Sequence, residues 1–184
     1  MDWIAWSLLI VSSGFAASTL LLRPAKKPTK PRKLLTLASL LTAVAAALLG
    51  SIAATNENSG NIPLLLIIVV SVIFAITSGS AYTELIFHLA ANQQAKSAEA
   101  QGEASPLRGG LWIGLLERAA IASTLWASWP EGVAVVLAIK GLGRFSELKN
   151  HRAAEQFILG TFSSALCACA AYGIGLLLSH GAAG

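Results

Sequence analysis

The sequence predicts an all-α fold, a polytopic transmembrane bundle of six helices with both termini on the extracytoplasmic side. Of its 184 residues, 55% are hydrophobic and 12% are charged, whereas a soluble domain has roughly 25% charged residues. Apolar stretches of about 20 residues recur, which is enough to cross a hydrocarbon core of ~30 Å. When successive connections are assigned to opposite sides, no Lys or Arg falls in an extracytoplasmic connection, as the positive-inside rule requires.

The first two predicted helices cover residues 3–22 and 34–54 and are joined by the basic connection from Arg23 to Lys33. Its three prolines interrupt a helix, and its six basic residues resist translocation. We therefore expect this connection to be cytoplasmic and to contact anionic lipid headgroups. Because the basic residues follow the first apolar stretch rather than precede it, we expect a retained helix and not a secretory signal peptide.

The third predicted helix covers residues 62–83 and continues past Glu84 and His88, which are spaced i, i+4 on one helical face and form a possible pair at the inner face. The following residues, rich in Gln, Ala, Glu, Ser and Gly, predict a mobile cytoplasmic linker. The chain is thus predicted to have three parts: an N-terminal three-helix unit (1–91), the linker (92–110) and a C-terminal three-helix unit (111–184).

The last three predicted helices cover residues 111–129, 133–145 and 153–179, with a tight extracytoplasmic turn at Pro130. The apolar part of the fifth, residues 133–143, is shorter than the ~17 to 25 residues that a membrane span normally requires. The alternative topology therefore has five spans, with this stretch as a re-entrant element.

Charged residues within these helices form a candidate intramembrane network, since an unpaired charge at the bilayer centre costs roughly 2.5 to 3.5 kcal/mol. A hairpin turned at Pro130 and Glu131 would bring Glu117 level with Arg144, which predicts a salt bridge. Arg118 is expected to reach the cytoplasmic headgroups, whereas Lys140 lies near the midplane without a partner. The network consists of Glu117, Arg118, Lys140, Arg144 and Glu155. It either anchors helices or forms a cytoplasm-facing vestibule for an ion, proton or small anion.

Small residues favour close helix packing in the C-terminal unit, including Gly141 and Gly143 beside Lys140. The predicted helix-packing face contains Gly110, Gly114, Thr161, Ala165, Cys169 and Gly173. No nucleophile, base and orienting residue combine by spacing, and neither the histidines nor the cysteines have metal-ligand spacing. We therefore expect no enzyme activity, cofactor or metal.

The C-terminal third resembles the C-terminal membrane region of an uncharacterised family of bacterial integral membrane proteins. The residues that carry this resemblance are Gly114-Leu115-Leu116-Glu117-Arg118, Ala138-Ile139-Lys140, Arg144-Phe145 and Ala154-Glu155-Gln156-Phe157-Ile158-Leu159-Gly160-Thr161. The resemblance implies a bacterial inner (cytoplasmic) membrane protein, and the family has no established activity.

Two functions remain open from the sequence. The first is a non-enzymatic accessory or scaffolding subunit of a larger membrane complex, such as a respiratory or transport complex, with a membrane-protein partner or self-association. The alternative is a small carrier or channel with a charged vestibule around Glu117, Lys140 and Arg144. Nucleic-acid binding is not expected, because six of the thirteen basic residues behind the net charge of +4 lie in one connection between apolar segments.

Overall fold

The computed structural model describes residues 2–21, 30–53, 63–94, 110–145, 149 and 151–180, which form helices and no strand. The six helices are α1 (Asp2–Leu21), α2 (Lys30–Ala53), α3 (Leu64–Gln94), α4 (Gly110–Trp126), α5 (Glu131–Gly143) and α6 (His151–His180). The all-α prediction is confirmed. Most of the basic connection and most of the predicted linker lie outside the described residues.

Helix boundaries differ from the predicted ones near Pro31 and Pro130. α2 begins at Lys30 and includes Pro31 in its first turn, where a missing backbone N–H costs no helical hydrogen bond. α4 ends at Trp126, earlier than predicted, and α5 begins at Glu131 directly after Pro130. The α4/α5 turn therefore lies closer to the N-terminus than the sequence indicated.

Three helices are long and apolar enough to cross a membrane, which is the character of an integral membrane protein. The three apolar spans are Lys33–Ile52, Leu64–Thr83 and Ala153–Ser179. α1 carries the shorter apolar stretch Trp3–Thr19, α4 has 17 residues and α5 has 13. At about 1.5 Å per residue α5 is about 20 Å long, less than a hydrocarbon core of ~30 Å. Six spans, and five spans with a re-entrant element, both stay predictions.

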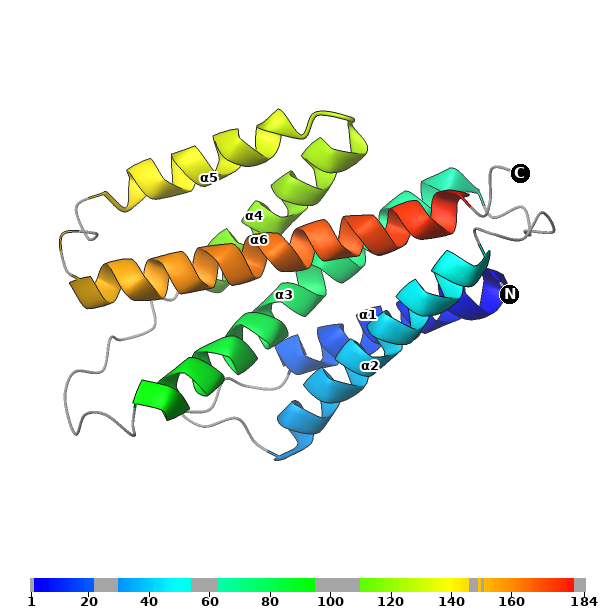
Figure 1. Cartoon of the computed structure of the whole chain (residues 1–184), viewed down its shortest axis with the longest axis horizontal. Coiled ribbons are helices and arrows are strands. Elements are labelled where there is room, and N and C mark those ends of the chain that lie inside the picture. Colours follow the sequence, from blue (N-terminus) through cyan, green and yellow to red (C-terminus); the bar gives the residue numbers. More distant parts are fainter. Residues whose placement is uncertain are drawn as a thin grey trace.

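α3 lies at the centre of the bundle and packs against α1, α4 and α6 (Figure 1). α1 and α2 form a hairpin on one side, and α6 also packs against α2 and α4. The two predicted three-helix units are thus in contact through α3 and α6. α5 packs against α4 at the periphery, and α1 begins at the same end of the bundle at which α6 ends (Figure 1).

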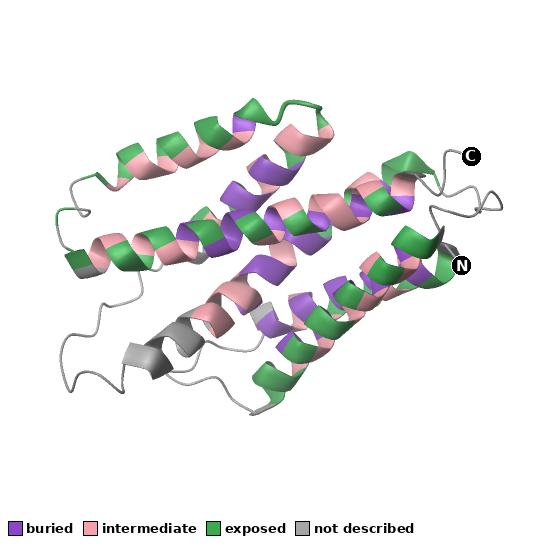
Figure 2. Ribbon diagram, viewed as in Figure 1, coloured by how far each residue is buried: buried purple, intermediate pink, exposed green. Residues whose placement is uncertain are grey.

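Most of the buried apolar residues are small, and many of the large apolar residues face outward. Of the fifteen buried hydrophobic residues among those described, ten are alanine. Large side chains such as those of Leu41 (69% exposed) and Leu142 (75% exposed) face outward, and exposed positions follow the outer sides of the helices in Figure 2. This distribution suits a bundle that packs through small side chains while its surface contacts acyl chains.

Buried hydroxyl groups link the helices at several points. The Ser12 hydroxyl donates to the backbone oxygen of Ser39 at 2.8 Å, and the Ser39 hydroxyl lies 2.9 Å from the Tyr82 hydroxyl. These contacts join α1, α2 and α3. Eleven residues earlier on α3, Ser71 Oγ accepts a hydrogen bond from Trp126 Nε1 at 2.9 Å, and the Trp126 ring packs edge-on against Tyr172.

The predicted packing face on α6 is buried at its beginning and turns outward along the helix. Thr161 and Ala165 are buried and Cys169 is half-buried, but a Cβ on Gly173 would have nothing within 4 Å. A strict four-residue spacing advances about 40° beyond each full turn, because an α-helix has about 3.6 residues per turn. The buried side of α6 follows instead the positions Ser164, Ala168, Ala171, Gly175 and Leu178.

The glycines at close helix contacts are mostly ones that the sequence did not single out. A Cβ on Gly175 would lie 2.7 Å from the Trp126 ring, and one on Gly50 would lie 3.1 Å from Leu178. Gly141 and Gly143, in contrast, have nothing within 4 Å of a Cβ. Close helix approach therefore occurs away from Lys140.

Candidate functional site

The turn between α4 and α5 fixes how the two helices face each other. Ser128 has a φ of 57°, and the Trp129 N–H donates to the Thr124 backbone oxygen at 2.9 Å. Gly132 is buried, and a Cβ there would lie 2.6 Å from Thr124 Cγ2 and 2.8 Å from Trp129 Cε3. A side chain at position 132 would collide with Thr124 and Trp129, so glycine at this position permits the tight hairpin.

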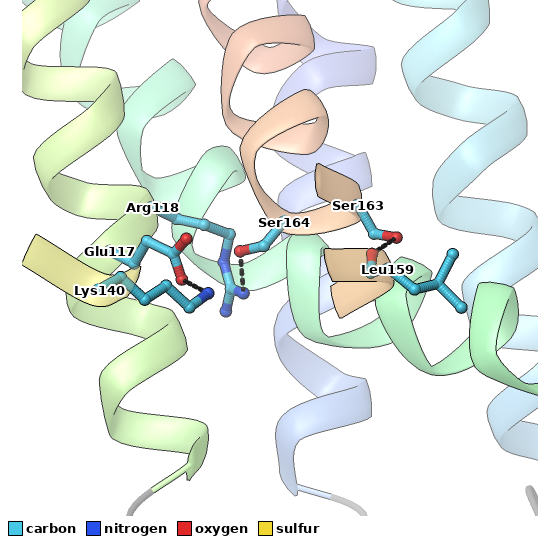
Figure 3. A network of polar contacts seen from close by, with 6 residues as sticks. All are labelled: Glu117, Arg118, Lys140, Leu159, Ser163 and Ser164. Atoms are coloured by element: carbon cyan, nitrogen blue, oxygen red, sulfur yellow. Dashed lines mark hydrogen bonds and ion pairs between the residues drawn. The ribbon is translucent and has the colours of Figure 1, made fainter. Parts of the chain in front are cut away.

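This turn places Lys140, rather than Arg144, as the ion-pair partner of Glu117. Glu117 lies nine residues before the last residue of α4, Trp126, and Lys140 lies nine residues after the first residue of α5, Glu131. The Lys140 ammonium donates to Glu117 Oε2 (Figure 3). The predicted pairing of Glu117 with Arg144 required a turn centred two residues later in the chain than the observed one. A shift of two residues in the turn moves the facing residue on α5 by four residues, which is about one helical turn.

The ion pair lies against α6 and is largely shielded from solvent. The Glu117 side chain is 4% exposed and that of Lys140 is 20% exposed. Lys140 Nζ lies 5.8 Å from the centre of the Phe157 ring, close enough for a cation–π interaction. The second carboxylate oxygen, Glu117 Oε1, is buried and has no hydrogen-bond partner among the described residues.

Arg118 points into the bundle instead of toward headgroups. It is 3% exposed, its Nε donates to the Ile76 backbone oxygen at 3.1 Å, and its Nη1 donates to Ser164 Oγ at 3.3 Å (Figure 3). As the residue next to Glu117, Arg118 is rotated by about 100° around α4 and so faces α3 and α6. The prediction that the Arg118 side chain reaches outward to the headgroups is therefore wrong.

Two glycines make room for the Arg118 side chain. A Cβ on Gly79 of α3 would lie 2.2 Å from Arg118 Cδ and 2.6 Å from Nε. A Cβ on Gly114, in α4 itself, would lie 3.3 Å from Nη1. Gly114 was predicted as part of a packing face between helices, but the group nearest its Cβ position belongs to its own helix. Gly79 was missed, and its one signal in the sequence is the small-residue run Ser78-Gly79-Ser80.

The other predicted residues lie elsewhere. Arg144 is half-buried and follows α5 as its C-terminal cap. Glu155 is exposed and lines an open hollow of about 420 Å³ at the beginning of α6. Glu84 and His88 belong to α3, but their side chains are outside the described residues, and Gly110 is the first residue of α4.

The structure therefore brings together Glu117, Arg118 and Lys140 from the predicted network and adds Phe157, Ser164 and the Ile76 backbone oxygen. No family model, curated protein or solved structure matches this chain.

Proposed function

We propose that this protein is a non-enzymatic accessory or scaffolding subunit that packs against a larger assembly in a bacterial inner membrane. In this proposal both termini are extracytoplasmic and the basic connection from Arg23 to Lys33 faces the cytoplasm. α1 begins and α6 ends at the same end of the bundle (Figure 1), which supports placing both termini on one side of the membrane. The charge distribution supports the orientation.

One observation carries the subunit proposal: α5 is short, peripheral and apolar on its outer side. α5 packs against α4, and Val135, Ile139 and Leu142 are 46%, 66% and 75% exposed. A helix shorter than the hydrocarbon thickness leaves a mismatch that helix association can relieve. A partner helix on this face would cover the apolar side chains and complete the membrane-embedded layer beside α4.

Site-specific photo-crosslinking in intact membranes tests this face. With p-benzoylphenylalanine at Leu142 or Ile139, we expect crosslinks to the same membrane protein, identified by mass spectrometry after gentle detergent extraction. The matched control is Leu41 on α2, which is 69% exposed and far from α5 along the chain. Crosslinks only to lipid or to a second copy of this chain, or equal capture from all three positions, would refute the subunit proposal.

A second candidate, a small carrier or channel, is favoured by the position of three charged groups inside the helical layer. Glu117 and Arg118 are buried and Lys140 is partly accessible, and buried ionisable residues in membrane helices commonly line ion pathways. In proteoliposomes with an internal pH-sensitive dye and an imposed potential, we expect proton flux that Lys140→Met abolishes. Lys149→Met, at an exposed position, is the control. Equal flux in wild type and Lys140→Met would remove Lys140 from any such path.

A further inference from the structure

We propose that Glu117 and Phe157 form a binding site for a small primary ammonium ion, and that the Lys140 side chain occupies this site as a built-in ligand. The site belongs to α4 and α6, whereas its present occupant comes from α5. The inference does not depend on the partner subunit proposed above.

The carboxylate of Glu117 has the properties that recognition of an ammonium group requires. Its side chain is 4% exposed, so its charge is weakly screened by solvent. Oε2 accepts a hydrogen bond from the Lys140 ammonium, while Oε1 is buried with no hydrogen-bond partner among the described residues. An ammonium group has three N–H donors, so an untethered ion is free to adopt a position that engages both oxygens.

The Phe157 ring supplies a second, independent element of recognition. Its centre lies 5.8 Å from Lys140 Nζ, within the range in which an aromatic face attracts a cation. A carboxylate on one helix and an aromatic ring on another therefore contact the same ammonium group. Neither Glu117 nor Phe157 belongs to α5, so removal of the lysine amine deletes neither recognition element.

The partial exposure of Lys140 is the feature through which the occupant would exchange. α5 packs against α4, and the glycines that follow Lys140, Gly141 and Gly143, have no atoms within 4 Å of a Cβ. The Lys140 side chain is 20% exposed, which gives an entering ion a route. When the lysine amine is deleted, a bound monovalent ammonium ion restores the net charge beside Arg118, so the ligand class is a monovalent primary amine.

Chemical rescue of Lys140→Ala tests the site. This substitution removes three carbons and the amine, the atoms of n-propylammonium. In the full chain in detergent micelles, we expect Lys140→Ala to unfold at a lower temperature than wild type. n-Propylammonium chloride should raise that temperature saturably, whereas sodium chloride and n-propanol at the same concentrations should not. Wild type should need about tenfold more n-propylammonium for any shift, because the tethered amine competes at high effective concentration.

The control variants decide whether rescue reflects this site. Glu117→Gln combined with Lys140→Ala should show no rescue, and Phe157→Leu combined with Lys140→Ala should need several-fold more n-propylammonium. If Lys140→Ala is not recovered folded, the measurement is the yield of folded protein extracted in n-propylammonium chloride, compared with the yield in sodium chloride at the same concentration. Absence of rescue in Lys140→Ala, or equal rescue with Glu117→Gln present, would overturn the proposal.

Discussion

Reversing the charge of Glu117 is expected to lower the free energy of unfolding by roughly 3 to 5 kcal/mol, the range found when a buried ion pair loses one partner. Glu117→Lys would place a third cation beside Lys140 and Arg118, with the Glu117 position almost fully buried. The loss should appear as a lower yield of folded protein and a lower unfolding temperature in detergent.

Double reversal separates the two possible registers of the α4/α5 hairpin. Glu117→Lys with Lys140→Glu should recover much of the lost stability, because these side chains contact each other. Glu117→Lys with Arg144→Glu is the matched control and should not recover it. The opposite outcome, rescue through Arg144, would show that the turn is centred near Pro130 and Glu131, contrary to the observed register.

Replacing Gly79 with alanine is expected to destabilise the protein by about 3 kcal/mol. Overpacking a core typically costs about 1 to 3 kcal/mol, and a buried donor that loses its hydrogen-bond partner costs about 1 to 3 kcal/mol more. The new Cβ would lie 2.2 Å from Arg118 Cδ, in the middle of a side chain held by Ile76 and Ser164. Arg118 therefore cannot yield without losing its hydrogen bonds.

Gly141→Ala is the control for this prediction. Its Cβ would meet nothing within 4 Å, and replacing a helical glycine with alanine typically stabilises by about 0.5 to 1 kcal/mol. Thermal unfolding of both variants in the same detergent should therefore shift in opposite directions. A neutral Gly79→Ala would mean that Arg118 has another position of equal free energy.

The all-α fold was predictable from the sequence because long apolar stretches predict helices that can cross a membrane. Among the described residues, α2, α3 and α6 are helices of that length and apolar character. The exact ends of helices did not follow, since Pro31 within α2 and Pro130 before α5 both occupy positions that a helix start tolerates. Proline alone does not say on which side of it a helix begins.

The candidate site was predictable as a set of charges but not as a set of contacts. Ser128 in the α4/α5 turn has a left-handed backbone conformation, and no feature of the neighbouring sequence requires a serine to adopt it. The inward position of Arg118 depends on space left by Gly79, a residue of another helix. Such pairings are set by tertiary packing and are not encoded in the periodicity of either helix.

The hydroxyl contacts among Ser12, Ser39 and Tyr82 have a consequence for how α1 and α2 find their alignment. The buried residues of α1 and α2 are nearly all small, namely alanine, serine, threonine and glycine. Such side chains offer few shapes that interlock, so neighbouring helices could slide along their axes with little change in contact. The hydrogen bond from Ser12 to the Ser39 backbone and the one between the Ser39 and Tyr82 hydroxyls require these residues to lie at matching heights along the three helices. In a medium without water these groups have few other hydrogen-bond partners. The hydrogen bonds therefore favour one axial alignment of α1, α2 and α3, which the small side chains alone would not specify.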